Sequence, residues 1–81
     1  MTKEERHILA DALENAWQIC YGRELQVTLT PNWFLIYGIH PGTPEPERLD
    51  NEQMRMLTIG TMSRALDRLS LVFKRETQEA L

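Results

Sequence analysis

Hydrophobic residues recur at helical spacing along the first part of the chain. Between Thr2 and Gly22, apolar positions return every third or fourth residue, with polar residues on the other side of the expected helix. Thr2 and Glu5 have the spacing of a capping box, and Gly22 suits the left-handed residue that ends a helix. The pattern therefore predicts a helix over residues 3–21. Its predicted buried face comprises Ile8, Leu9, Ala12, Leu13, Ala16, Trp17 and Cys20.

Strict alternation replaces helical spacing in the next segment. In ELQVTLT, apolar and polar residues take turns, which is typical of a half-buried strand. A second apolar run, WFLIYGI, follows a short break that is rich in turn residues. Two strands joined by a short turn predict an antiparallel hairpin over residues 24–40.

Prolines interrupt regular structure after the expected hairpin. Residues 41–49 hold three of the four prolines, so we expect a linker there. Asp50 and Gln53 repeat the capping-box spacing, and only Gly60 interrupts the helical pattern that follows. This pattern predicts a second, longer helix over residues 50–77.

The second predicted helix carries two apolar surfaces. With residues placed at ~100° intervals, most apolar positions fall on one broad face that we expect to pack on the core. Leu57 and Leu71 fall on the far side, with Arg64 and Arg68 beside them. Isolated leucines on a wet face need no explanation, but beside arginines and small residues they also fit a contact with another protein. The broad face comprises Met54, Met62, Ala65, Leu66, Leu69, Val72 and Phe73, with Ile59 at its edge.

Both faces of the second predicted strand are apolar. Trp33, Leu35 and Tyr37 point to one side, whereas Phe34 and Ile36 point to the other. If the helices cover the first side, burying Phe34 and Ile36 against another chain would contribute ~1.5–3 kcal/mol for each. The alternative is that the hairpin lies clamped between its own two helices.

These elements predict one α+β domain over residues 1–81, in the order α-β-β-α. It consists of an N-terminal helix, a two-stranded antiparallel hairpin and a long C-terminal helix. A two-stranded sheet is not stable by itself, and a chain of 81 residues buries only ~60% of its unfolded surface. We therefore expect dimerisation to complete the fold.

Composition and charge narrow the class of protein. The chain has 12 acidic and 9 basic residues, a net charge of −3, which disfavours a protein built mainly to coat nucleic acid. Charges begin at residue 3 and no apolar run approaches ~20 residues, so we expect neither a signal sequence nor a membrane span. The single cysteine excludes an internal disulfide and fits a reducing compartment. We expect a cytoplasmic protein.

Candidate residues for catalysis or metal binding are few. A metal site would need His7, Cys20 and His40 to converge, and none of the close ligand pairs of zinc modules is present. Cys20 belongs to the apolar face of the first predicted helix, which favours a structural thiol. The carboxylates of residues 45–52 suit a helix start, where negative charge is favourable. We expect no enzyme activity, no metal and no cofactor.

The sequence favours a small non-enzymatic protein-interaction module, an adaptor or inhibitor that occupies the surface of a partner and forms a homodimer. A nucleic-acid-binding transcriptional regulator is the alternative. A small-ligand pocket between Trp17, Trp33 and Tyr37 cannot be distinguished from aromatic residues that meet in a core. The predicted protein-contact residues are Phe34, Ile36, Leu57, Arg64, Arg68 and Leu71. The alternative nucleic-acid contact would use Arg64, Arg68, Lys74 and Arg75.

Overall fold

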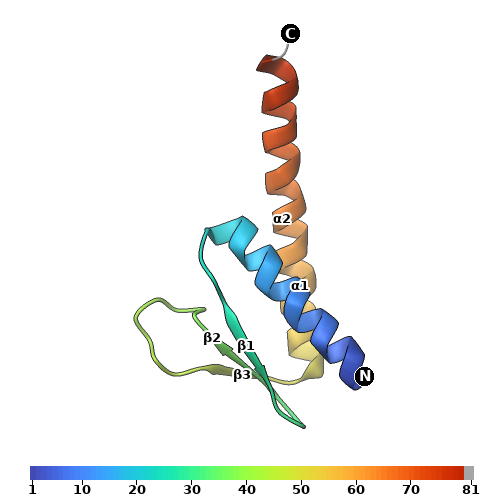
Figure 1. Ribbon diagram of the computed structural model, residues 1–81, viewed down its shortest axis with the longest axis vertical. Coiled ribbons are helices and arrows are strands. Elements are labelled where there is room, and N and C mark those ends of the chain that lie inside the picture. The colour runs from blue at the N-terminus through green and yellow to red at the C-terminus, as the bar shows by residue number, and fades with distance from the viewer. Residues whose placement is uncertain (80–81) are drawn as a thin grey trace.

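The protein is an α+β chain in which one helix precedes and one helix follows the three strands of a single sheet along the sequence (Figure 1). The computed structural model describes residues 1–79 and their side chains through Lys74. Its elements, in chain order, are α1 (Lys3–Tyr21), β1 (Gln26–Leu29), β2 (Phe34–Tyr37), β3 (Glu47–Leu49) and α2 (Asn51–Glu79). The predicted α+β class, with a helix at each end, is confirmed.

Local capping interactions fix where the helices begin and where α1 ends. The backbone N–H of Glu5 donates to Thr2 Oγ1 at 3.1 Å, and Gly22 ends α1 with φ of 68°. At α2, the N–H of Gln53 donates to Asp50 Oδ1 at 2.8 Å, and the N–H of Asp50 donates to Gln53 Oε1 at 3.0 Å. The caps expected from residue spacing are therefore present at both helices.

The sheet has a strand that the sequence did not indicate. β2 lies in the centre and pairs antiparallel with β1 on one side and with β3 on the other. The prediction of a two-stranded element followed by a linker is therefore wrong over residues 47–49. Glu47, Arg48 and Leu49 form only a three-residue strand directly after the prolines, and that composition has little strand propensity. Pairing with β2 and packing of Leu49 against the core hold it in place.

The sheet turns Phe34 and Ile36 toward the helices. Both side chains are buried, 0% and 1% exposed, within the core of the chain itself. The expectation that these two residues lack cover from their own chain is therefore wrong. Alternation fixes which residues share a face of a strand, but it does not say which face meets the helices. The buried core cluster comprises Leu13, Trp17, Leu25, Phe34, Ile36 and Met54.

The outer face of the sheet carries the remaining apolar side chains of β2. Leu35 and Tyr37 are half-buried there, and Trp33 is 38% exposed. The guanidinium carbon of Arg48 lies 4.3 Å from the centroid of the Trp33 ring, a cation–π contact from the neighbouring strand. β3 therefore shields part of the outer face as well as extending the sheet.

An arginine near the start of α1 ties this helix to the β1–β2 turn. Arg6 Nη2 donates to the carbonyl oxygens of Thr30 and Trp33, at 2.6 and 2.9 Å. Its guanidinium carbon also lies 4.6 Å from the centroid of the Phe34 ring. One charged side chain thus satisfies two backbone acceptors and covers a core aromatic ring.

A second arginine does the same beyond the other end of α1. Arg23 donates to the carbonyl oxygens of Gly38 and Ile39, where the chain leaves β2. Its guanidinium carbon lies 5.6 Å from the Trp17 ring centroid. α1 is therefore anchored at both of its ends to the two ends of β2.

The C-terminal half of α2 rises beyond α1 and the sheet (Figure 1). The radius of gyration is 14.8 Å, larger than the ~12 Å expected for a compact chain of this length. Within the part of the chain that the structure describes, no helix has the length and apolar content needed to cross a membrane. The elongated outline is therefore a property of one helix that only partly packs on its own domain.

Replacing Arg6 with methionine should lower the free energy of unfolding by about 2–3 kcal/mol, because two carbonyls lose a charged donor while the apolar stem is kept. Urea denaturation followed by circular dichroism measures this change. Lys3→Met, an exposed position on the same helical turn, is the control and should cost less than about 0.5 kcal/mol. Equal losses for the two variants would contradict the anchoring role of Arg6.

Candidate functional site

The two helices meet through small side chains. Ala16 and Cys20 of α1 pack against Ala65 of α2 in one buried cluster. Thr58 and Thr61, on the same side of α2, are 1% and 2% exposed. Small side chains on both helices allow their backbones to approach closely. We call these five residues the small-residue seam.

Buried threonines are tolerated at the seam because their hydroxyls are satisfied within α2. Thr58 Oγ1 donates to the carbonyl of Met54, and Thr61 Oγ1 donates to the carbonyl of Leu57, each at 2.7 Å. This bond to the carbonyl four residues earlier removes the cost of burying a hydroxyl. A pattern of hydrophobic residues carries no signal that either threonine is buried.

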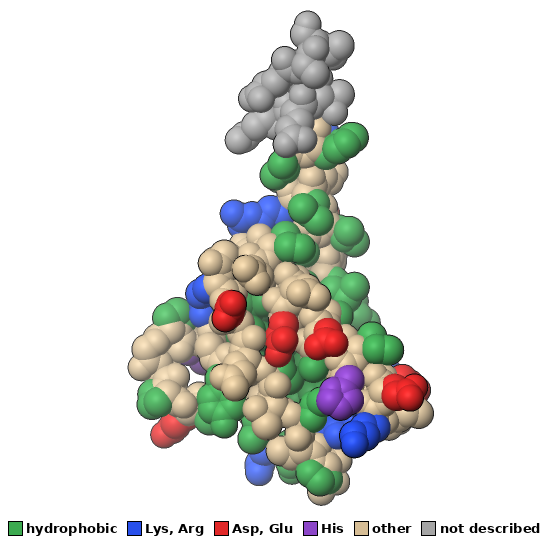
Figure 2. Space-filling model, in the orientation of Figure 1, with side chains coloured by type: hydrophobic (Ala, Val, Ile, Leu, Met, Phe, Trp, Pro, Cys, Tyr) green, Lys and Arg blue, Asp and Glu red, His purple; other side chains and the backbone are tan. Residues whose placement is uncertain are grey.

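Because the small residues of α2 face α1, most of the large apolar residues of α2 lie outside the core of the chain. The broad face predicted to be buried is wrong for most of its members: only Met54 and Ala65 are buried. From residue 66 to residue 74 every side chain is exposed. Figure 2 shows hydrophobic side chains along the part of α2 that rises beyond α1. Five of the exposed residues share one narrow face of the helix, and we call them the α2 stripe: Ile59, Met62, Leu66, Leu69 and Phe73.

The α2 stripe has the spacing of a helix–helix contact. Its members follow one another at intervals of three and four residues, the pattern that keeps one narrow face toward a partner helix. Beside it, α1 and α2 border an apolar groove of about 250 Å³, in which Asn15 is the only polar side chain among the described lining residues. The rest of the groove is lined by Ala12, Ala16, Ile19, Met62, Ala65, Leu66 and Leu69.

The predicted leucine contacts on the far side of α2 are separated by the structure. Leu57 is half-buried and packs against the core cluster, so it belongs to the fold. Leu71 is 68% exposed and lies on the side of α2 opposite the stripe. The structure therefore does not join these two residues into one surface.

The predicted arginine contacts lie against the end of α1. Arg68 Nη1 donates to the carbonyl of Cys20 at 2.6 Å, within the last turn of α1, whose carbonyls lack helical partners. Arg64 Nη1 donates to the hydroxyl of Tyr21 at 3.1 Å. A positive charge at this end of α1 is also attracted by the negative end of the helix dipole, which is stabilising. Both arginines therefore help to hold α1 on α2.

The nucleic-acid alternative shares these two arginines. Lys74 is exposed, while the side chain of Arg75 lies outside the described part of the structure. Arg64 and Arg68 donate hydrogen bonds to α1. Lys74 is the other member of the predicted set whose side chain the structure describes, and it lies in solvent. We therefore take the α2 stripe, and not this basic set, as the candidate site.

The residues considered for chemistry take structural positions. Cys20 is buried, and its Sγ donates to the carbonyl of Thr61 at 3.5 Å. His40 Nε2 lies 3.1 Å from Glu47 Oε1, at the surface. Among the residues that the structure describes, no three His, Cys, Asp or Glu side chains gather as metal ligands would. Trp17 lies in the core and Trp33 on the outer face of the sheet, so the structure does not bring them together in one pocket.

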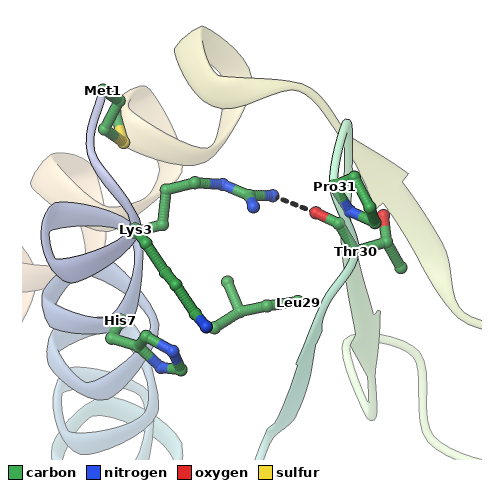
Figure 3. A pocket seen from close by; sticks show the side chains of 7 residues that line it. Met1, Lys3, His7, Leu29, Thr30 and Pro31 are labelled. Atoms are coloured by element: carbon green, nitrogen blue, oxygen red, sulfur yellow. Dashed lines mark hydrogen bonds between the residues drawn. The ribbon is translucent and has the colours of Figure 1, made fainter.

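An open cleft of about 480 Å³ lies between the start of α1 and the β1–β2 turn (Figure 3). Lys3 and His7 line one side of it, and Thr30 and Pro31 line the other. Arg6 also lines the cleft, and its Nη2 donates to the carbonyl oxygen of Thr30 on the other side. The Arg6 side chain already binds backbone carbonyls, so the interaction that spans this cleft stabilises the fold.

No protein-family model matches this sequence, and no curated protein or solved structure matches it either. The surfaces described above are therefore the basis on which a function is assigned.

Replacing Arg68 with methionine should lower the free energy of unfolding by about 1–2 kcal/mol, because the last turn of α1 loses a charged donor. Chemical denaturation measures the loss. Arg64→Met is the matched control on the same helix and should cost less than about 0.5 kcal/mol, since its bond to a tyrosine hydroxyl is exposed. A larger loss for Arg64→Met than for Arg68→Met would contradict this assignment.

Proposed function

We propose that this chain is a small non-enzymatic protein-interaction module, an adaptor or inhibitor that works in the cytoplasm by occupying the surface of a partner protein. Its contact surface is the α2 stripe together with the apolar groove between α1 and α2. The observation that supports the proposal is the exposure of Ile59, Met62, Leu66 and Leu69 along one face of a helix. Exposed apolar patches of this extent mark interaction sites.

The side chains around the stripe also fit a protein contact. Arg64, Asp67 and Arg68 project from other sides of α2, so no charged residue interrupts the stripe between Ile59 and Phe73. Depletion of charge is characteristic of the buried centre of an interface, whereas charged residues remain at its rim. Burying one large apolar side chain of the stripe contributes ~1.5–3 kcal/mol to binding.

The partner that this surface fits is an amphipathic helix. The groove is bounded by two helices, and its apolar lining would receive side chains spaced by three and four residues. This changes the contact residues from those that the sequence suggested. Phe34 and Ile36 belong to the core, and Arg64 and Arg68 bind α1.

Photo-crosslinking inside the native cells tests this proposal. A photoreactive amino acid in place of Leu66 should give covalent adducts with a partner protein, because residue 66 lies in the stripe. The same amino acid in place of Leu71 is the matched control, since the two leucines are equally exposed, 66% and 68%, on opposite sides of α2. We expect adducts at position 66 at several times the yield at position 71.

Equal yields at the two positions, or no adduct at position 66, would refute the stripe as the contact surface. The mass of the adduct also identifies the partner, whether it is a second copy of the chain or a different protein.

A further inference from the structure

We infer that the helix that occupies the α2 stripe is α2 of a second copy of this chain, and that the two α2 helices pair antiparallel. This inference rests on the proposed function, because it names the partner of the same surface. It follows from the extent of the apolar surface, from the offset between the groove and the exposed end of α2, and from the position of one arginine.

The exposed apolar surface has the extent that a stable dimer needs. Ile59, Met62, Leu66, Leu69 and Val72 of α2 are 43–66% exposed, and Ile19 of α1 borders them at 40%. Together they present roughly 600 Å², of the order of the ~800 Å² that each partner contributes to a standard interface. A twofold dimer requires a surface that is complementary to itself, and it closes without leaving a second copy of the patch exposed.

The groove and the exposed end of α2 are offset along the helix. The groove lies beside residues 62–69, where α1 flanks α2, whereas the exposed end begins at residue 66 and runs past the contact with α1. If two α2 helices run antiparallel, the exposed end of each lies along the groove of the other. Leu69 and Val72 of one copy then pack near Ile19 and Met62 of its partner. Parallel pairing would place the two exposed ends together and leave both grooves open.

Arg55 also favours the antiparallel orientation. It lies four residues before Ile59, in line with the α2 stripe and exposed. In a parallel pair the two Arg55 guanidinium groups would face each other across the interface between the two α2 helices, where like charges repel. In an antiparallel pair each Arg55 lies toward the C-terminal end of the partner's α2, where the helix dipole is negative.

Disulfide formation between single cysteine variants tests both the partner and the orientation. Ser63 and Ser70 are exposed and border the stripe on the side away from α1, so Ser63→Cys and Ser70→Cys are small changes. In an antiparallel pair, position 63 of one copy lies beside position 70 of the other. The two purified full-length variants are mixed, oxidised and analysed by mass spectrometry. The wild-type protein, whose own Cys20 is buried, is the control.

The expected result is a mixed 63–70 disulfide that forms at least about 10-fold faster than either symmetric disulfide. Introducing Leu66→Asp should weaken the dimer by about 100-fold or more, because the change occurs in both copies of a buried position. Leu71→Asp should leave the dimer unchanged. Circular dichroism confirms that both variants keep their helices.

Two results would overturn the inference. A protein that sediments as a dimer but forms no 63–70 disulfide would show that the helices do not pair antiparallel. A monomer in sedimentation at the concentrations of the experiment, with no disulfide between copies, would show that the chain does not pair with itself. In that second case, photo-crosslinks from position 66 to a different protein would leave the proposed function standing, whereas their absence would remove both.

Discussion

The close contact between α1 and α2 determines which surfaces of this protein are left for other molecules. Ala16, Cys20, Thr58, Thr61 and Ala65 are the residues that fit between the two helices. Larger residues would force the helices apart, so a small side-chain volume matters more than hydrophobicity at these five positions. Since one face of α2 is used by small side chains, most of its large apolar side chains lie on a neighbouring face, which the described part of the chain leaves exposed.

The same contact organises the sheet. α1 packs on α2 along the seam and is anchored to β2 by Arg6 and Arg23, so one helix joins both halves of the chain. This arrangement presses Phe34 and Ile36 into the core and leaves the outer face of the sheet to Trp33 and its contact with Arg48. The domain therefore covers the inner face of its sheet with its own residues, and most of the exposed large apolar side chains among the described residues lie on α2.

Residue spacing predicted what local physics determines. Both helices, their caps at Thr2, Gly22 and Asp50, and the alternation of β1 follow from interactions within a few residues. The facing of each element does not. Which side of β2 is buried and which side of α2 packs depend on contacts between distant segments, and buried Thr58 and Thr61 have no signal in a hydrophobic pattern. β3 was missed because three residues acquire their strand geometry from pairing with β2.

Amide hydrogen exchange over residues 66–74 most directly tests whether a second copy covers α2. These residues are exposed in the single chain, where little burial supports this part of the helix, so their amides should exchange readily. If two copies pair along α2, protection of these amides should rise with protein concentration and should be lost in Leu66→Asp. Exchange that stays the same at every concentration, and is unaffected by Leu66→Asp, would contradict pairing through this face.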